Sequence, residues 1–395
     1  MSRQLLMAGG GIGALSAALA ATRAGWEVRL HEQAQAFSEV GAGLQLGPNA
    51  TRVLHAWGLG HALSQVACFP EALVARSAAS GRSLGRLPLG TRCHTRYGAP
   101  YATVHRHDLH QLLLRALTSA GGAHLHLSSP VLHYTEVPDG IQLSWPDGRI
   151  VEADALIGAD GVWSRVREQL LGDGPARATG HQAFRALVPM ADVPVALSGN
   201  EVTAWLGPRL HVVSYPVRGA EQMNLVVIVQ GQPPQELQSW DQEALVDDVQ
   251  AALAHCCAPL QDLARAAPAW GRWTLCDRPP VTGPQELAGG RVALLGDAAH
   301  PMRPFLAQGA GMALEDAAEL GRCLGQVHDL ALGLPAALGR YAMQRWQRVG
   351  RVQARARRNG EVFHATGPER LGRDIALSLL GRRLMEMPWL YGHGR

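Results

Sequence analysis

The sequence of 395 residues predicts a mixed α/β fold, in which a parallel-sheet domain is interleaved with an antiparallel β-sheet domain and followed by a helical C-terminus. Three observations predict this fold. The chain opens with an apolar strand, a glycine-rich turn and an Ala/Leu helix; residues 180–230 alternate or are β-branched; and an α/β pattern returns near residue 290.

The first sixth of the chain has the pattern of a β-α-β unit. Gln4 to Ala8 is a short apolar run, and Gly9 to Gly13 is a turn that leads into a helix over Ala14 to Ala24. Gly25 stands where a helix C-cap is expected, and Val28 to Glu32 follows as a second strand. A short helix between two strands predicts parallel pairing.

The middle of the chain continues the parallel sheet and then changes character. We expect a helix, a hairpin around Pro146-Asp147-Gly148 and a third buried strand ending at Asp160-Gly161. Four later runs predict an antiparallel sheet. The helix is expected over Asp108 to Ala120, the hairpin over Ile141 to Trp145 with Arg149 to Ala153, and the buried strand over Ala155 to Ala159. The four later runs are Gln182 to Val188, Val202 to Leu206, Leu210 to Tyr215 and Met223 to Val229.

The last third is predicted to be mainly helical. We expect a helix over Asp241 to Cys257, a strand over Arg291 to Leu295, a loop to Pro304 and a helix over Gly309 to Leu324. We therefore divide the chain into residues 1–175 and 276–395, which form the parallel-sheet domain with C-terminal helices, and residues 176–275, which form the β-sheet domain.

Composition restricts the chemistry. All 36 basic residues are arginine, so a Walker phosphate loop, a Schiff base and a lysine base are excluded. A net charge of +3 argues against phosphate-driven nucleic-acid binding. The six cysteines form no CxxC pair, which favours a reducing cytoplasm, and no run of residues predicts a membrane span. No cluster of metal ligands is visible, and we expect no metal.

The turn GGGIGA fits the G-x-G-x-x-G/A pattern at Gly9, Gly11 and Ala14, between a strand and a helix. Small residues, Gly13 included, let the backbone approach a pyrophosphate, whose charge meets the amides at the helix start. Glu32 ends the second strand, where its carboxylate can accept hydrogen bonds from a ribose. The alternative, a plain glycine-rich turn, leaves the register of these features unexplained.

Three segments together resemble the FAD-dependent aromatic hydroxylases, which are single-component class A flavoprotein monooxygenases. They are GGGIGA, GADGVWSRVR at Gly158 to Arg167 and LLGDAAHP at Leu294 to Pro301. Within this class the chain is most similar to the branch of salicylate hydroxylase, 3-hydroxybenzoate 6-hydroxylase and 6-hydroxynicotinate 3-monooxygenase. The segments that carry this similarity are EVGAGLQLGPNA at Glu39 to Ala50, HRHDLH at His105 to His110, GPRLHVVSYPVRG at Gly207 to Gly219 and LAQGAGMALEDA at Leu306 to Ala317.

The resemblance implies a Rossmann-like FAD-binding domain and a set of FAD-binding residues. Asp297 would accept hydrogen bonds from the ribityl hydroxyls, Arg106 would hold the pyrophosphate or ribityl chain, and Asp160 would serve the pyrophosphate region. Each has a structural alternative: a turn aspartate, a solvated arginine, a β-turn at a strand end. The implied set is completed by Gln45, Val131, Gly296, Gly309, Ala310 and Gly311. At the helix start Gly309 to Gly311, small residues would let the flavin approach and the positive helix end would stabilise its reduced form; close helix packing is the alternative there.

On the substrate side, the resemblance implies that His211 is a general base. In a strand over Leu210 to Tyr215, His211 and Tyr215 share one face. NAD(P)H would reduce the flavin, O2 would form a C4a-hydroperoxyflavin, and removal of a phenolic proton would make the ring nucleophilic. The reference pKa is about 6.5 for histidine and about 10 for a phenol, so complete transfer of the phenolic proton to the imidazole would cost roughly 5 kcal/mol. Partial proton transfer in the transition state is therefore favoured. Tyr215 would orient the substrate hydroxyl, or else pack.

The aromatic substrate stays open at this point. Gln45 stands where hydroxypyridine-specific relatives tend to carry histidine, and Pro304 matches salicylate-type relatives better; Arg185 could pair with a substrate carboxylate or lie at a sheet edge. We expect NADH or NADPH as co-substrate and a monomer or homodimer. One alternative is a flavin oxidase or dehydrogenase. Another is a flavin-bound regulatory protein that uses a row of arginines at helical spacing, although a solvated helix face is the simpler interpretation of that row. The row consists of Arg345, Arg348, Arg351, Arg355 and Arg358.

Overall fold

The computed structural model describes residues 3–37, 42–145, 147–231, 237, 242–329 and 332–394. The chain forms two compact units that are interleaved in sequence. Unit 1 comprises Met1–Glu39, Leu109–Arg177 and Cys276–Ala356, and unit 2 comprises Val40–Asp108, Ala178–Leu275 and Arg357–Arg395. The interleaving was predicted, but the predicted boundaries placed residues 40–108 and 357–395 with the dinucleotide-binding domain.

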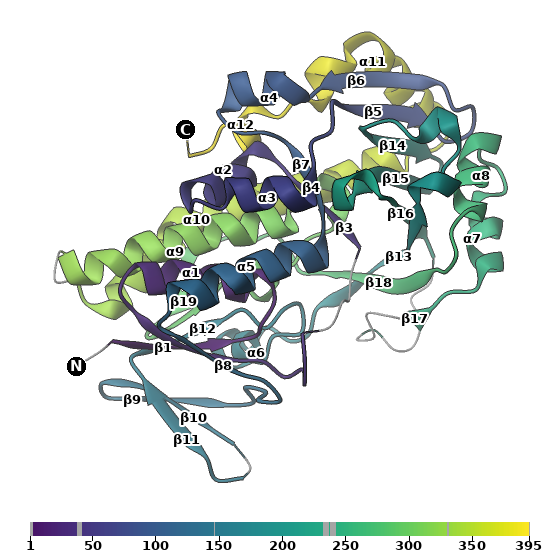
Figure 1. Ribbon diagram of the computed structural model, residues 1–395. Helices are drawn as coiled ribbons and strands as arrows, with labels where there is room; N and C mark the ends of the chain where they lie inside the picture. Colours follow the sequence, from purple (N-terminus) through teal and green to yellow (C-terminus); the bar gives the residue numbers. More distant parts are fainter. Residues whose placement is uncertain are drawn as a thin grey trace. The chain divides into compact units, whose positions relative to one another are not determined.

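Unit 1 is built on a six-stranded sheet in the order β19-β20-β12-β1-β2-β8 (Figure 1). All neighbouring strands are parallel except β19 and β20, so the predicted β-α-β opening is confirmed. A second, three-stranded sheet, β11-β10-β9, contains the predicted hairpin, although Pro146 of its turn lies outside the described residues. The strands are β1 (Gln4–Ala8), β2 (Glu27–His31), β8 (Ala123–His126), β9 (Tyr134–Val137), β10 (Gly140–Ser144), β11 (Ile150–Ala153), β12 (Ala155–Gly158), β19 (Ala288–Gly289) and β20 (Val292–Leu294).

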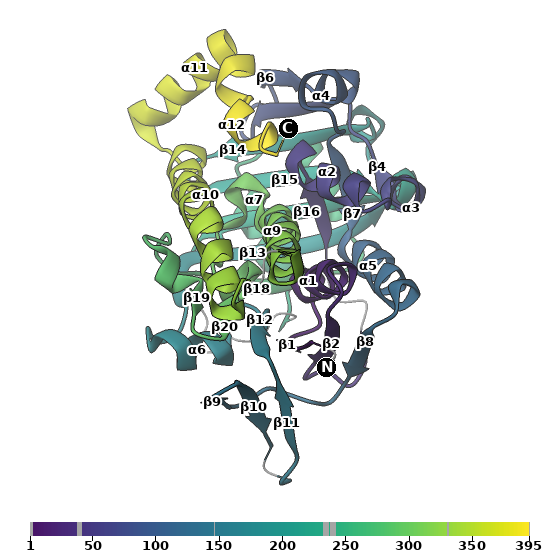
Figure 2. The same ribbon diagram turned by 90° about the vertical axis from the view of Figure 1, so that its left-hand side faces the viewer.

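The helices of unit 1 pack through small residues. Helix α1 (Ile12–Arg23) lies alongside α9 (Gly309–Asp329), as both views show (Figures 1 and 2). A Cβ built on Gly321 would lie 2.8 Å from the Cβ of Ala20, so glycine is required for this approach. The other helices that begin or end in this unit are α5 (Arg106–Ala120), α6 (Arg165–Leu171) and α10 (Leu334–Phe363).

Unit 2 is built on an eight-stranded sheet in the order β17-β18-β13-β16-β15-β14-β5-β6. The four strands predicted for this region are present as β13 (Arg177–Pro189), β14 (Glu201–Gly207), β15 (Leu210–Val217) and β16 (Gln222–Gln230). Strand β5 joins β14 in parallel, and this pairing draws residues 40–108 into unit 2. The remaining strands are β3 (Gly43–Leu46), β4 (Ala67–Cys68), β5 (Ala72–Ser77), β6 (Ser83–Pro88), β7 (Ala102–His105), β17 (Gln242–Glu243) and β18 (Gly271–Asp277).

The main core of unit 2 lies between one face of the sheet and two helices. Val212, Leu225 and Val227 from the sheet pack with Leu253 and Leu260 from the helices, all nearly inaccessible to solvent. The helix predicted over residues 241–257 is present but shorter at both ends, as α7 (Val246–Leu253); a separate helix, α8 (Ala258–Arg265), follows it, and Asp241 lies outside the described residues. Helix α8 begins at Ala258, and Pro259 lies in its first turn, where proline fits because the backbone nitrogen there makes no hydrogen bond within the helix.

The C-terminal residues of unit 2 are helical, as predicted. Helix α11 (Gly367–Met385) packs on β6, and Figure 2 shows the two elements together. The other helices are α2 (Pro48–Ala56), α3 (Gly60–Val66), α4 (Gly90–Tyr97) and α12 (Pro388–Tyr391). Within the described ranges, no helix combines the length and apolar character that a membrane crossing needs.

Candidate active site

The turn between β1 and α1 presents backbone amides beside open space. Gly9 has φ of +99°, and a Cβ on it would lie 2.4 Å from the carbonyl oxygen of Ala159, so only glycine fits. Gly11 is the N-cap of α1, and a Cβ on it would meet nothing within 4 Å. No side chain caps this helix start. Amide groups at an uncapped helix start suit an anionic group such as a pyrophosphate.

Glu32 lies directly after β2 and is fixed by backbone amides. Its Oε2 accepts a hydrogen bond from the amide of Gly10, and its Oε1 accepts one from the amide of Ala34 at 2.8 Å. The carbonyl of Glu32 accepts from the amide of Ser129 at 2.8 Å. This contact brings the loop that carries half-buried Val131 to the end of β2. Glu32 and the Gly9–Ala14 turn are thus connected within unit 1.

The loop from Gly296 to Pro301 is held by a buried carboxylate. Asp316 Oδ2 accepts from the amide of Gly296 at 3.0 Å and lies 2.6 Å from His300 Nε2, while Asp316 Oδ1 accepts from Arg345 Nε at 2.7 Å. Burial alone would raise the pKa of Asp316, but the charges of His300 and Arg345 and these hydrogen bonds hold it well below its usual range. Asp316 is therefore ionised at neutral pH.

Three further side chains brace the same loop. Arg167, which is 3% exposed, donates to the carbonyls of Ala298 and Ala299, and its guanidinium also pairs with Asp173 at 2.7 Å. Tyr341 donates to the carbonyl of Leu294 at 2.9 Å, and Gln353 donates to that of Pro301 at 3.1 Å. The backbone around Asp297 is thus fixed on every side within unit 1.

Asp297 is the exposed residue in this loop. The residues from Val292 to Pro301 are otherwise buried. A Cβ built on Gly309 would lie 4.0 Å from Asp297 Oδ1, so the carboxylate lies beside the first turn of α9, where Ala310 and Gly311 also lie. Gly13 and Gly296 serve close packing here, because Cβ atoms on them would lie 3.1 Å from Leu295 Cδ1 and 3.4 Å from Ala313 Cβ.

Asp160 has a local structural role. Its carboxylate accepts from the hydroxyl of Ser164 and from the amides of Arg165 at 2.8 Å and Val166 at 3.2 Å. These groups form the first turn of α6, so Asp160 satisfies amides that would otherwise lack partners. This arrangement matches the structural alternative for Asp160, in which it stabilises a turn at the end of a strand.

Unit 2 places His211 and Tyr215 on the face of β15 opposite the main core. His211 is 1% exposed, and its Nδ1 lies 2.7 Å from Nε2 of His364. Burial, followed by the charges of His364 and His181, lowers the pKa of His211 well below 6.5. The Tyr215 hydroxyl donates to the carbonyl of Gly43 at 2.7 Å, and burial raises its pKa. His211 is therefore neutral, and Tyr215 is protonated.

Two further predicted residues lie in or directly after the three-stranded sheet β3-β7-β4 of unit 2. Gln45 Oε1 accepts from the Tyr101 hydroxyl at 2.7 Å, and Gly43, in the same strand, donates its amide to Asn224 Oδ1 at 2.7 Å. Arg106 is half-buried at the start of α5, and its amide donates to the carbonyl of Ala42 at 3.1 Å. Residues 38–41, which include the first three residues of the EVGAGLQLGPNA segment, lie outside the described residues.

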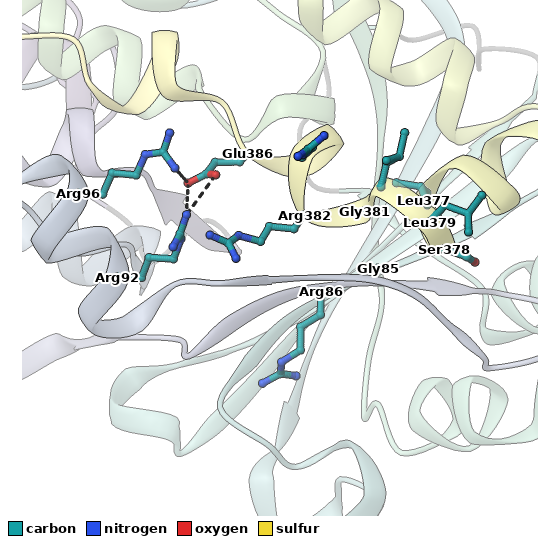
Figure 3. Close-up of a pocket in the computed structure, with 12 residues that line it drawn as sticks. Gly85, Arg86, Arg92, Arg96, Leu377, Ser378, Leu379, Gly381, Arg382 and Glu386 are labelled. Atoms are coloured by element: carbon teal, nitrogen blue, oxygen red, sulfur yellow. Dashed lines mark hydrogen bonds and ion pairs between the residues drawn. The ribbon is translucent and has the colours of Figure 1, made fainter.

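Unit 2 also contains a basic hollow. Residues of α4, β6 and α11 line it, as Figure 3 shows. Its volume is ≈ 900 Å³. Glu386 accepts there from Arg92 at 3.4 Å and pairs with Arg96 at 2.9 Å (Figure 3). None of the predicted site residues lines this hollow. It is lined by Gly85, Arg86, Arg92, Arg96, Leu377–Arg383 and Glu386.

The arginines predicted to form a solvated helix face do so only in part. Arg345 is 2% exposed and pairs with Glu315 and Asp316, and Arg348 also pairs with Glu315. Arg351 and Arg358 are exposed, as expected. The prediction fails at Arg345 because α9 presents two adjacent acids to α10. Arg185 lies over the ring of Trp273, with 5.4 Å from its guanidinium carbon to the ring centroid.

Sequence reasoning missed three residues that the structure makes prominent. Arg167 lies in the GADGVWSRVR segment, which carries part of the family resemblance, and this membership was the signal for a structural role of its side chain. Asp316 and the preceding glutamate interrupt an otherwise apolar stretch of a helix. Acidic residues in such a stretch indicate a buried ion pair, because a buried charge needs a partner. His364 had no local signal at all, because its partner His211 is 153 positions away.

The chain is similar to known proteins over nearly its whole length. A match to the family described as "FAD binding domain" covers residues 3–356. The chain is 39% identical to 3-hydroxybenzoate 6-hydroxylase of Polaromonas naphthalenivorans, over 98% of this chain and 95% of that one. It is 37% identical to 6-hydroxynicotinate 3-monooxygenase of Bordetella bronchiseptica, over 89% of each. A solved salicylate hydroxylase substrate complex superimposes with a TM-score of 0.81 at 27% identity, covering 99% of this chain and 97% of that one.

Proposed function

Because this chain belongs to the FAD-binding class A flavoprotein monooxygenases, we propose that it hydroxylates a small phenolic or hydroxylated heteroaromatic acid with NAD(P)H and O2. The observation that carries this proposal is the similarity over nearly the whole chain to hydroxylases of this kind, including 3-hydroxybenzoate 6-hydroxylase. Its six cysteines are unpaired, which is consistent with our placing of the enzyme in the cytoplasm.

The residues of unit 1 fit an FAD. Open space beside Gly11 and the uncapped start of α1 suit the pyrophosphate, and the fixed carboxylate of Glu32 suits the adenosine ribose. Asp297, exposed in an otherwise buried loop, would accept hydrogen bonds from the ribityl hydroxyls. We give Asp160 an indirect part, since its carboxylate is already engaged by α6. Bound FAD would supply the redox chemistry that activates O2.

On the substrate side, we assign His211 the role of general base. A neutral imidazole can take up the phenolic proton as the ring is attacked, which increases the electron density of the ring. Because the pKa of His211 lies well below 6.5, its gap to a phenol exceeds the roughly 3.5 units that reference values give. Full ionisation of bound substrate is therefore disfavoured, and proton transfer would accompany oxygen transfer.

Tyr215 would orient the substrate hydroxyl. Its own proton is engaged by the carbonyl of Gly43, and the Gln45 side chain is a second hydrogen-bond partner of its hydroxyl, so toward the substrate it would act as an acceptor through its remaining lone pair. Gln45 would lie near the ring, where its amide is oriented by Tyr101. With glutamine at this position, we expect hydroxybenzoates to be better substrates than hydroxypyridines.

The proposal is tested by the spectrum of the purified protein and by its turnover. We expect flavin absorption, NADH oxidation stimulated by one of a panel of hydroxybenzoates, and a product heavier by one oxygen atom that is labelled when 18O2 is used. Product formation without nicotinamide would instead identify an oxidase or dehydrogenase. Failure of every aromatic acid to stimulate NADH oxidation, with bound FAD present, would favour a regulatory flavoprotein.

Two glycine substitutions separate folding from FAD binding. Gly11→Ala should leave the free energy of unfolding of the apoprotein nearly unchanged, because no atom lies within 4 Å, but it should raise the Kd for FAD by obstructing the pyrophosphate. Gly9→Ala should destabilise the apoprotein itself, because φ is +99° and the new Cβ would lie 2.4 Å from the Ala159 oxygen. Urea unfolding and fluorimetric FAD titration measure the two effects. Equal FAD affinity of Gly11→Ala and wild type would contradict the assignment.

A further inference from the structure

Three buried histidines from distant parts of the chain meet in unit 2. His211 comes from β15, His364 from the C-terminal end of α10 and His181 from β13; they are 1%, 4% and 8% exposed. His211 Nδ1 and His364 Nε2 are 2.7 Å apart, and the rings of His181 and His364 have centroids 5.1 Å apart. A contact this short between two ring nitrogens requires that one of them carries a hydrogen and the other does not.

The backbone fixes His364 firmly. Its amide donates to the carbonyl of Gly360, and its carbonyl accepts from the amide of Arg209 at 3.1 Å in the turn just before His211. The preceding carbonyl, of Phe363, accepts from Arg373 at 2.6 Å. The ring of Phe363 also contacts the His211 ring edge-on, with centroids 5.3 Å apart. The His364 imidazole is thus held at one place against His211.

The direction of this hydrogen bond decides what His211 can do. If His364 donated, His211 would carry its hydrogen on Nε2 and could not accept a proton there. If His211 Nδ1–H donates, Nε2 of His211 is unprotonated and basic, and His364 carries its hydrogen on Nδ1. Only the second arrangement agrees with a base at His211.

We propose that His364 is a positioning residue, which accepts a hydrogen bond from His211 Nδ1 and thereby holds His211 in the tautomer with a basic Nε2. This inference rests on the proposed role of His211 as the general base. During proton uptake, the substrate proton moves to His211 Nε2, the Nδ1–H bond to His364 is kept, and the positive charge is shared across a hydrogen bond instead of lying on an isolated ring. No redox change occurs at either histidine.

Apolar side chains flank His211 in the sheet. The residues directly paired with His211 in the neighbouring strands are Leu206 and Ile228, and Phe363 packs on its ring. The titratable groups that act on it are His364 and His181, and both oppose its protonation. His364 therefore acts on His211 by geometry and by accepting a hydrogen bond, and not by supplying a negative charge as a carboxylate would.

The test compares His364→Leu with His364→Gln, because a glutamine oxygen can accept where histidine Nε2 does and leucine cannot. In His364→Leu we expect kcat for coupled hydroxylation to fall about 10- to 100-fold, with the substrate KM and the rate of flavin reduction by NADH within about twofold of wild type. His364→Gln should recover most of the loss. His61→Leu, at an exposed histidine of the same unit, is the control and should change nothing.

A double variant separates failure of this inference from failure of the proposed function. His364→Leu added to His211→Asn should cost nothing further, because His364 acts through His211. If His211→Asn lowers hydroxylation but His364→Leu does not, the positioning role is overturned and the base survives. Equal losses in His364→Leu and His364→Gln, or a further loss in the double variant, would also overturn the positioning role. If His211→Asn has no effect, the proposed base itself is wrong.

Discussion

The His211→Ala enzyme is expected to bind FAD normally and to lose about 100- to 10,000-fold in the rate of coupled hydroxylation, the range that a positioned base contributes. The reason is that the phenolic proton then has no acceptor as oxygen is transferred. NADH oxidation in the presence of substrate should continue, with H2O2 replacing hydroxylated product. The measurement is the ratio of product to NADH consumed, together with the flavin spectrum.

The pH profile gives the same prediction a second test. Because burial and two neighbouring imidazoles lower the pKa of His211 well below 6.5, the base stays neutral as pH falls through 6.5. Coupled turnover should therefore show no loss at pH 6.5 that depends on His211. The same shift makes the unfolded state bind the proton more readily, so this group lowers stability as pH falls below about 6.5.

Two further variants keep the His211 prediction testable if alanine opens a cavity in unit 2. His211→Asn retains a polar side chain of smaller size and should lose hydroxylation to a similar extent. Val213→Ala changes a half-buried residue two positions along the same strand and should keep the product-to-NADH ratio. A His211→Asn enzyme that hydroxylates at the wild-type rate would remove His211 from the reaction.

Replacing Asp316 by alanine is expected to lower the free energy of unfolding by about 3–5 kcal/mol, as for other broken buried ion pairs. Arg345, 3% exposed in its side chain, would lose one of its two carboxylate partners, and the amide of Gly296 would lose its acceptor. The Gly296–Pro301 loop that carries Asp297 would also lose its main support. We therefore expect weaker FAD binding as well as lower stability.

Urea unfolding followed by far-UV circular dichroism measures the first effect of Asp316→Ala, and FAD titration measures the second. Glu168→Gln serves as the matched control, because it removes an acid paired with an arginine at a site that is 58% exposed. Such exposed pairs contribute at most about 1 kcal/mol, so this control should unfold almost as wild type does. An Asp316→Ala protein within 1 kcal/mol of wild type would contradict the buried network.

Much of the fold was predictable because it depends on short-range pattern. The strand over Gln4–Ala8 was predicted with its observed bounds, and the four strands predicted for the sheet of unit 2 were each found within a few residues of their observed ends except at the start of β13; β5, β6, β17 and β18 of the same sheet were not predicted. Alternation along a strand also placed His211 and Tyr215 on one face correctly, because successive side chains of a strand point to opposite sides. The role of Gly9 was also predictable, because the turn that requires a glycine there is formed by neighbouring residues.

The β-α-β opening, the glycine turns, four strands of the unit 2 sheet and a family resemblance could be predicted because each depends on residues that are neighbours in the chain. Two other findings needed the folded structure: Arg345 is buried, and Asp160 accepts hydrogen bonds from the first turn of α6. So did the support that Arg167 gives to the loop of Asp297. The contact of His364 with His211 also became known only from the structure. The physical reason is that the state of a charged or hydrogen-bonding side chain depends on its partners, and here most of those partners come from elements that are distant along the chain.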